Sequence, residues 1–284
     1  MADIQIITSA HGGELRGISR AGKPYMWNAD PSFWGRVAPI LFPIVGQVRD
    51  KTFRAEGRTF TMGQHGIARD AEFVRTGEHA YRLLQETPAA NYPYPFELTV
   101  RYEVDADSVL CAWTVRNIGQ GNMYFQIGAH PAFLLPDYRP EDAVHGYFEC
   151  YNADGDRINP LAFTYIDGGL RSPYPSPRPL GVRIPITADT FAADALLIEG
   201  SQVASCSLLD KAGNKVLTVE SPMAEAFGLW APHKPGCPFV CIEPWCGITD
   251  RNGFTGDFSQ KDLIHSLQPG GVFDFSYRIR LHVI

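Results

Sequence analysis

Three short stretches of the sequence each place a titratable side chain among turn or strand-end residues. They are residues 64–70 (QHGIARD), 128–133 (GAHPAF) and 241–245 (CIEPW). Functional groups are often found on such connections, where a rigid sheet holds them in place. An imidazole and a carboxylate brought together in this way are suited to general acid–base catalysis, in which protons move to and from a reacting substrate.

Two of the eight histidines stand out by their neighbours. His130 precedes Pro131, which favours an extended backbone for the histidine and ends the preceding strand. A histidine at a strand end projects into the cleft that lies there, and His65, which precedes Gly66, has the same potential. A surface position or a satisfied core position is the alternative for both.

Glu243 ends a run of apolar residues, and strand alternation places it on the same face as Phe239 and Cys241, the expected inward face. A carboxylate at such a position costs free energy unless it has partners. Two interpretations stay open: an ion pair with Arg69 or Arg49, or a general base that faces a substrate beside Trp245.

The cysteines raise the question of a metal site. His233, Cys237, Cys241 and Cys246 are ligand types that zinc prefers. Their spacing lacks the two-residue knuckle of structural zinc sites, and Cys241 lies in an apolar run, so we expect buried thiols and no metal or other cofactor. Six cysteines without a CxxC pair indicate free thiols in a reducing compartment.

The elements that must position these groups are strands. Residues 96–104 alternate between apolar and polar types, residues 109–115 continue the period after turn residues, and residues 273–283 alternate again, which predicts a hairpin and a long C-terminal strand. Shorter β-like runs occupy residues 5–8, 72–76, 81–85, 146–151, 182–186, 204–209, 215–220 and 239–243.

Helical periodicity is almost absent, so we expect an all-β protein in which antiparallel sheets form a sandwich or barrel. The proline-rich residues 171–179 are predicted to be an exposed loop within one domain that spans residues 1–284.

The composition and the motifs that are missing argue against several classes of function. A formal net charge of -6 and the absence of a basic run argue against nucleic-acid binding. The longest apolar stretch, residues 38–46, is too short to span a membrane, and the N-terminus lacks a signal peptide, so we expect a cytoplasmic protein. No dinucleotide-binding glycine motif, phosphate loop, serine nucleophile elbow or zinc-protease helix motif is present.

Five stretches taken together resemble one family. Residues 34–46, 65–70, 130–133, 193–196 and 242–245 follow the order of motifs in the aldose 1-epimerase (mutarotase) superfamily, and their closest likeness is to its LacX-like branch. The resemblance extends from near residue 13 to the C-terminus. It implies a β-supersandwich of large antiparallel sheets and a protein that acts on a small-molecule sugar without a cofactor.

The resemblance also implies roles for individual residues. His130 matches the histidine that protonates the ring oxygen of the sugar, and Glu243 matches the glutamate that removes the proton of the anomeric hydroxyl. The remaining candidates are assigned to sugar binding: His65, Arg69, Asp194 and Trp245. We expect these side chains to line one cleft, with His130 and Glu243 far enough apart to hold a sugar between them.

Three positions depart from the branch and concern sugar preference. Gln47 stands where arginine is usual, Ile67 where phenylalanine is usual, and Leu134 where asparagine is usual. Arg49 is a candidate replacement for the missing arginine.

Two alternative functions remain. A hexose-6-phosphate mutarotase would use basic residues at the pocket mouth, for which Arg36, Arg49 and Arg69 are candidates. A carbohydrate-binding protein without turnover would keep the fold but would not need both His130 and Glu243.

Overall fold

The computed structural model describes residues 4–163, 165–166, 169–174 and 176–282. These residues form antiparallel sheets, and their helical segments are 3-10 turns: η1 (Arg49–Lys51), η2 (Ala68–Asp70) and η4 (Phe258–Gln260). The expected all-β fold is confirmed. In this part of the chain, no helix has the length and apolar character needed to cross a membrane.

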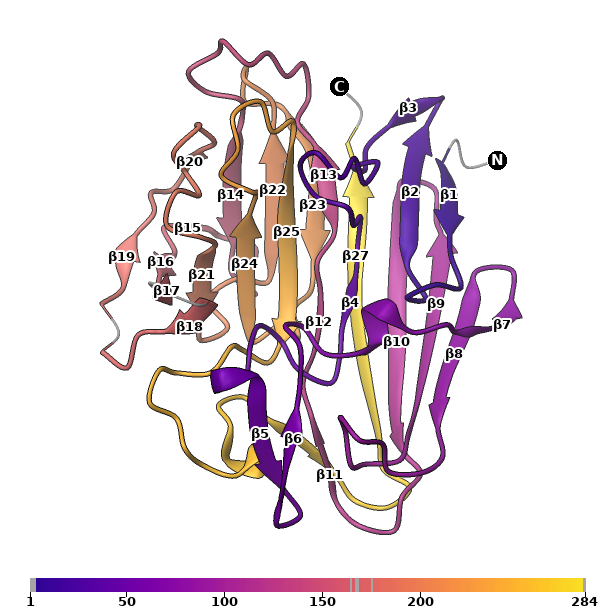
Figure 1. The fold of residues 1–284 in the computed structure, drawn as a ribbon. Coiled ribbons are helices and arrows are strands. Elements are labelled where there is room, and N and C mark those ends of the chain that lie inside the picture. The colour runs from indigo at the N-terminus through magenta and orange to yellow at the C-terminus, as the bar shows by residue number, and fades with distance from the viewer. Residues whose placement is uncertain (1–3, 164, 167–168, 175, 283–284) are drawn as a thin grey trace.

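The larger sheet has ten strands in the order β15-β14-β22-β23-β27-β10-β9-β8-β7, with β20 paired to β14 (Figure 1). Its strands are β7 (Val74–Gly77), β8 (Ala80–Gln85), β9 (Phe96–Val104), β10 (Ser108–Asn117), β14 (Tyr147–Tyr151), β15 (Arg157–Ile158), β20 (Ile184–Pro185), β22 (Ser205–Leu209), β23 (Lys215–Glu220) and β27 (Val272–Leu281). The predicted hairpin is confirmed as β9 and β10, and the predicted C-terminal strand as β27, with Val283 outside the described residues.

A six-stranded sheet lies in front of the larger one in Figure 1. It contains β4 (Ile40–Leu41), β12 (Ile127–Ala129), β13 (Ala132–Leu134), β21 (Leu196–Glu199), β24 (Ala226–Trp230) and β25 (Phe239–Cys246). The main core lies between the two sheets, where Trp113 and Phe275 from the large sheet join one cluster with Val240 and Ile242 of β25. Burial of each such side chain contributes about 1.5–3 kcal/mol, so this core holds the two sheets in a fixed relation.

Smaller ladders complete the fold. They are β1 (Ile4–Thr8) with β2 (Leu15–Arg20) and β3 (Lys23–Pro24), β5 (Thr52–Ala55) with β6 (Arg58–Thr61), β11 (Met123–Phe125) with β26 (His265–Leu267), β16 (Leu161–Ala162) with β19 (Arg178–Pro179), and β17 (Tyr165–Ile166) with β18 (Leu170–Arg171). Every shorter run that the sequence predicted contains a strand.

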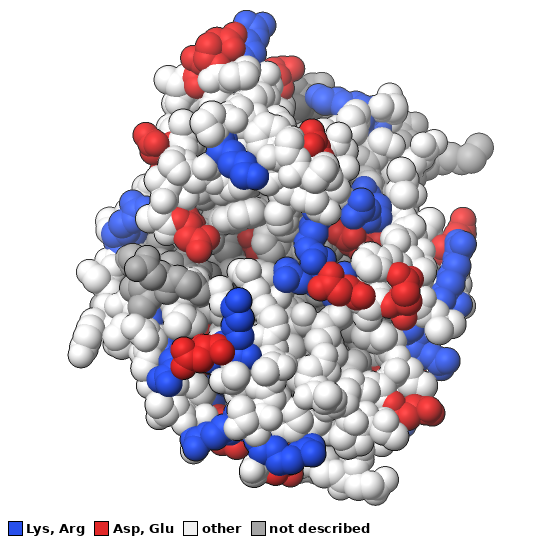
Figure 2. All heavy atoms as spheres, in the orientation of Figure 1, with Lys and Arg blue, Asp and Glu red and all other residues white. Residues whose placement is uncertain are grey.

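The proline-rich segment differs in part from the prediction. Its ends belong to β18 and β19, while Tyr174 between them is 84% exposed, as an extended loop requires. Pro175 lies outside the described residues. On the face that Figure 2 shows, basic and acidic side chains are interspersed over the surface.

Candidate functional site

The register of the six-stranded sheet brings His130 and Glu243 together. Strands β12 and β13 pair with β25 in one continuous antiparallel register on either side of Glu243. His130 lies in the step between β12 and β13, and this register places it opposite Glu243. Pro131 has no N–H to donate, so the ladder is interrupted here. Nε2 of His130 lies 3.2 Å from Oε2 of Glu243.

The expectation that a sugar fits between this histidine and this glutamate is therefore wrong. The two side chains are in contact, and each is buried. The strand register gives the reason, because it sets His130 directly opposite Glu243.

Alternation along β25 decides which way Glu243 points. Phe239 and Cys241 share its face, as predicted, but this face is turned away from the main core between the sheets. Phe239 and Cys241 instead pack in a smaller cluster with Trp27, and Trp245 packs in another. Glu243 lies on the strand between these apolar groups, on a face that is open to a pocket.

All six candidate residues line this pocket, which has a volume of about 320 Å³. They are His65, Arg69, His130, Asp194, Glu243 and Trp245, and they come from separate parts of the chain. A larger cavity of about 450 Å³, lined in part by Phe53 and Lys261, contains none of them. The pocket is smaller than this cavity, but of the two only the pocket brings an imidazole and a carboxylate into contact.

His130 is enclosed by aromatic rings. The Trp34 ring stacks on it with centroids 4.7 Å apart, and the Trp230 ring contacts it edge-on at 5.5 Å. Burial lowers the pKa of His130 to about 3, and the nearby charges of Arg69 and Arg36 act in the same direction. The imidazole is therefore neutral around pH 7 in the empty pocket.

The pKa of Glu243 is shifted in the opposite direction. Burial raises its pKa well above the ordinary glutamate value, the charge of Asp194 raises it further, and the Trp245 indole opposes the shift. Within the described residues His130 is its one ion-pair contact, so the alternative of an ion pair with Arg69 or Arg49 is excluded. The two pKa shifts together place the single proton of the pair on Glu243.

His65 is held by the backbone. Its φ is 63°, and Gly66 follows with φ 78°, where a Cβ would lie 2.2 Å from the Phe42 carbonyl oxygen. The backbone N–H of Gly46 donates to Nδ1 of His65 over 3.1 Å. Burial and the neighbouring His130 lower the pKa of His65 well below its usual value. The ring is therefore neutral with its proton on Nε2, which makes that nitrogen a hydrogen-bond donor.

Arg69 brings a cation to the pocket. Its side chain is 18% exposed, and its Nε has no hydrogen-bond partner among the described residues. Burial and the adjacent Arg36 lower its pKa to about 10, so it stays charged at neutral pH. Arg36 donates to Asp70 over 2.8 Å. Nε of Arg69 lies 3.7 Å from Oδ2 of Asp70, so two arginines share one carboxylate and keep one net positive charge beside the pocket.

Arg49 does not replace the arginine that the resemblance leads one to expect at position 47. Its Nε donates to Asp50 over 2.9 Å, and it lines the larger cavity. Gln47 does line the pocket. Of the other departures, Ile67 packs against the main core and Leu134 against the Phe239 cluster, so neither lines the pocket.

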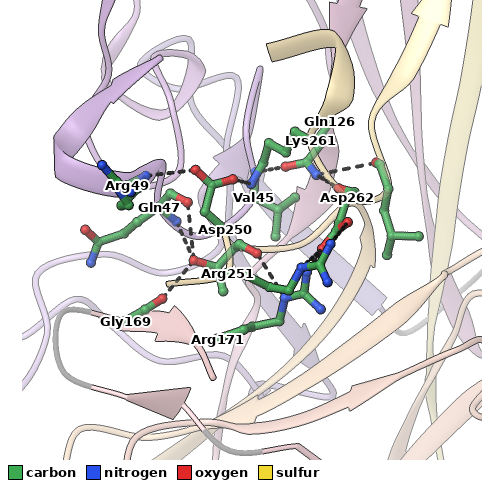
Figure 3. Close-up of polar contacts among 12 residues, drawn as sticks. Val45, Gln47, Arg49, Gln126, Gly169, Arg171, Asp250, Arg251, Lys261 and Asp262 are labelled. Atoms are coloured by element: carbon green, nitrogen blue, oxygen red, sulfur yellow. Dashed lines mark hydrogen bonds and ion pairs between the residues drawn. The ribbon is translucent and has the colours of Figure 1, made fainter. Parts of the chain in front are cut away.

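A polar network fixes the wall of the pocket that Gln47 and Gly169 form (Figure 3). Oγ1 of Thr249 accepts from the backbone N–H of Gln47 over 3.0 Å and donates to the carbonyl oxygen of Gly169 over 2.7 Å. Arg171 donates to the Thr249 carbonyl oxygen over 3.1 Å and to Glu199 over 2.9 Å. The wall is therefore tied to β18 and β21 as well as to the loop after β4.

The last two candidates, Asp194 and Trp245, differ in their exposure to solvent. Asp194 is exposed at the pocket rim with φ 78°, and its Oδ1 accepts from the backbone N–H of Ala195 over 2.8 Å. Trp245 is buried, and its Nε1 has no hydrogen-bond partner among the described residues. Its ring fits between Gly128 and Gly228, where a Cβ would lie 2.6 and 2.7 Å from ring atoms.

We expect Gly228→Ala to displace Trp245 and with it the adjoining Glu243 side chain. The added Cβ would meet Cζ2 of Trp245 at 2.7 Å and Cβ of Glu243 at 3.5 Å. Such overpacking costs about 1–3 kcal/mol, and a misplacement near 1 Å can slow a reaction about 10²-fold. Denaturant unfolding and kcat/KM measure the two effects. Gly121→Ala, where the added Cβ meets open space, is the control; equal behaviour of the two variants would contradict this account.

Sequence reasoning did not assign two tryptophans of the site, Trp34 and Trp230, or Gln64. Trp230 pairs with Cys241 across β24 and β25, two positions from the Glu243 pair, so alternation along β24 would place it on the pocket face. That signal becomes usable only when the pairing of the strands is known. Trp34 precedes the first strand of the sheet, and the local sequence gives no sign that it stacks on His130.

The cysteines agree with the prediction of free thiols, since none of the six forms a disulfide. The spaced series of His233, Cys237, Cys241 and Cys246 does not converge on one point within the described residues. Alternation sends Cys241 to the pocket face and Cys246 to the main core. Cys241 lies instead beside His130 and Glu243.

Comparisons with known proteins agree with this geometry. A family model described as aldose 1-epimerase matches residues 2–280. The chromosomal LacX protein of Lactococcus lactis subsp. lactis is 29% identical over 257 residues, which cover 84% of this chain and 83% of that protein.

Two solved structures share the fold. The structure of a galactose mutarotase related enzyme from Lactobacillus acidophilus matches with a TM-score of 0.89 and 30% identity, over 100% of this chain and 96% of that one. A galactose mutarotase-like protein from Lactobacillus casei matches with a TM-score of 0.89 and 25% identity, over 99% and 98%. The chain belongs to the aldose 1-epimerase family.

Proposed function

We propose that the protein is a mutarotase that interconverts the α and β anomers of a free hexose such as galactose or glucose. The observation that carries the proposal is the contact of His130 Nε2 with Glu243 Oε2, at 3.2 Å, in a pocket that all six candidate residues line. We further propose that the whole chain acts as one domain, because the two sheets share a single core cluster.

The reaction needs two proton transfers. Glu243 takes the proton of the anomeric hydroxyl while His130 gives a proton to the ring oxygen, the bond between C1 and the ring oxygen breaks, and an open-chain aldehyde forms. Rotation about C1–C2 followed by the reverse transfers gives the other anomer. Each positioned acid or base contributes roughly 10²–10⁴-fold in rate, so the pair provides useful acceleration.

The pKa shifts suit this cycle. Ring opening turns a protonated His130 and an ionised Glu243 into a neutral imidazole and a neutral carboxyl. Burial favours that neutral arrangement, because it lowers the pKa of His130 and raises that of Glu243. Ring closure regenerates the charged arrangement. Direct contact also lets the proton pass between the two side chains.

The other candidate residues bind the sugar. His65 offers an Nε2–H donor, Arg69 offers its charged guanidinium, and Asp194 offers a carboxylate at the rim. Trp245, buried between Gly128 and Gly228, supplies an apolar part of the pocket wall beside Glu243.

One observation favours a phosphorylated sugar as the second candidate substrate. Arg69 and Arg36 share Asp70, which leaves one net positive charge beside the pocket. A phosphate group would pair with it. A binding protein without turnover is disfavoured, since sugar binding does not require an imidazole and a carboxylate in contact.

Anomeric exchange measured by NMR tests the proposal. We expect exchange of free galactose or glucose to exceed the spontaneous rate, and we expect the 6-phosphates to be poorer substrates and weaker competitors. A phosphosugar that outcompetes the free sugar would establish the second candidate. Sugar binding without any exchange across free and phosphorylated aldoses would leave only the binding protein.

A further inference from the structure

Cys241 places a thiol beside the imidazole of His130 and the carboxylate of Glu243. Its Sγ, a ring nitrogen of His130 and a carboxylate oxygen of Glu243 all lie within 4.8 Å of one another. Cys241 lies two positions before Glu243 on β25, so both side chains leave the same face of the strand. Thiolate, imidazole and carboxylate are the three protein ligand types that Zn²⁺ binds.

The spacing suits a tetrahedral ion. Zinc–ligand distances of about 2.0–2.3 Å put neighbouring donor atoms roughly 3.3–3.6 Å apart at the tetrahedral angle. His130 Nε2 and Glu243 Oε2 are already 3.2 Å apart. From the 4.8 Å limit, the sulfur needs a shift of at most about 1.2–1.5 Å to complete the set, which a χ1 adjustment provides.

The donors of this cluster are also free. Oε2 of Glu243, on a side chain that is 2% exposed, has no hydrogen-bond partner among the described residues. No hydrogen bond to Cys241 Sγ is found in that part of the chain. The adjoining pocket of about 320 Å³ gives an ion a route to the site and room for a water as fourth ligand.

A second cluster of the same ligand types lacks these properties. Glu225, Cys246 and His265 also lie within 4.8 Å of one another. There too the imidazole contacts the carboxylate, at 3.1 Å, but Cys246 Sγ donates to the Met223 carbonyl oxygen over 3.3 Å. This thiol already has a hydrogen-bond partner, which makes Cys246 a matched control for Cys241.

We propose that His130, Cys241 and Glu243 form a three-ligand site for a thiophilic divalent cation of the zinc type, and that the bound ion blocks the acid–base pair. Binding displaces the thiol proton and the proton shared by His130 and Glu243, so the affinity rises with pH. The ion is an inhibitor that competes with sugar, because it occupies the donors that the anomeric oxygens need. The inhibitory part rests on the proposed mutarotase function, whereas the binding part does not.

Titration of the full-length protein with Cd²⁺ and Co²⁺ alone, followed by absorption, tests the binding part. We expect one equivalent of metal to give a thiolate-to-metal band, which galactose weakens. We expect Cys241→Ala to lose the band and to bind metal at least about 10–100-fold more weakly, the range seen for outer-shell ligand changes. Cys246→Ala keeps the band. Cys241→Ser, which is closer in shape, is used if far-UV circular dichroism shows that the alanine variant is not folded.

Inhibition by Zn²⁺ tests the second part of the proposal, that the bound ion blocks His130 and Glu243. Where exchange is measurable, Zn²⁺ should inhibit it, a chelator should restore it, and the half-inhibiting Zn²⁺ concentration should rise at least about tenfold in Cys241→Ala relative to Cys246→Ala. A band of parental strength in Cys241→Ala, or a band lost only in Cys246→Ala, would overturn the site. Metal binding with full exchange activity would overturn the inhibition. If no sugar is exchanged, the absorption titration still decides whether the site exists.

Discussion

Replacing Glu243 by glutamine is expected to slow anomeric exchange by about 10²–10⁴-fold, the loss typical of a missing general base. Glutamine keeps the shape and the burial but cannot accept the hydroxyl proton. Because the sugar contacts of His65 and Arg69 remain, KM should change far less than kcat. Exchange rates from NMR across a range of sugar concentrations separate the two parameters. A variant with parental kcat would remove Glu243 from the proposed mechanism.

The same substitution should alter stability in a pH-dependent way. Burial raises the pKa of Glu243 in the folded protein above its unfolded value. The folded state therefore binds this proton more tightly, and the contribution of Glu243 is fully present below the unfolded pKa and lost as pH rises through the folded pKa. Glu243→Gln avoids that loss, so the free energy of unfolding of the variant should increase relative to that of the parent as pH rises.

Glu149 provides the matched control for this substitution. It is also buried, but Arg183 and Arg157 form ion pairs with it at 2.7 and 2.9 Å. Burial would raise the pKa of Glu149, but the hydrogen bonds from Arg183 and Tyr151 outweigh burial and lower it. Its stabilising contribution is present above the unfolded pKa and lost as pH falls. Glu149→Gln should therefore destabilise the protein at neutral pH. If both variants shifted stability in the same direction, the difference in environment would not be the cause.

Replacing His130 by asparagine is expected to reduce kcat by a similar factor, about 10²–10⁴-fold, because asparagine cannot transfer a proton to the ring oxygen. In the parent, kcat/KM should fall on the acid side only below the ordinary histidine pKa of 6.5, since burial lowers the pKa of His130 to about 3. In the variant, Glu243 must still be ionised to act as the base, and burial raises its pKa, so the acid limb should move to higher pH. Profiles of kcat/KM against pH for both proteins provide the measurement.

His145→Asn is the control for the histidine change. His145 is buried to the same degree, and its Nδ1 also has no hydrogen-bond partner among the described residues. It lies against the tilted ring of Tyr138 and does not line the pocket. Its replacement should leave kcat and the acid limb unchanged. An inflection at 6.5 in the parent, or an equal loss of kcat in the two variants, would contradict the assignment of His130.

The sequence alone predicts the strands well, because apolar and polar residues alternate along any strand that is buried on one side. Residues 96–104 and 273–283 show the period without any knowledge of their partners, and they form β9 and β27. The family motifs likewise identified six residues that the fold brings to one pocket. Both kinds of information are local in the chain, or consist of local pieces in a recognisable order.

The distances at the site could not be predicted in this way. The contact of His130 with Glu243 depends on the register of β12 and β13 against β25, which pairs segments more than 100 residues apart. The same pairing decides that Trp230 joins the site, and the fold of the loop after β4 decides that Arg49 does not.

The sequence thus determined the strands, the family and the residue types available for acid–base chemistry. The tertiary structure decided that His130 and Glu243 touch, that Cys241 lies beside them, and that Gly128 and Gly228 leave space for Trp245. The physical reason is that alternation fixes only the face on which a side chain emerges. Register between strands distant in sequence fixes which side chains meet, and burial at that meeting point sets their pKa values.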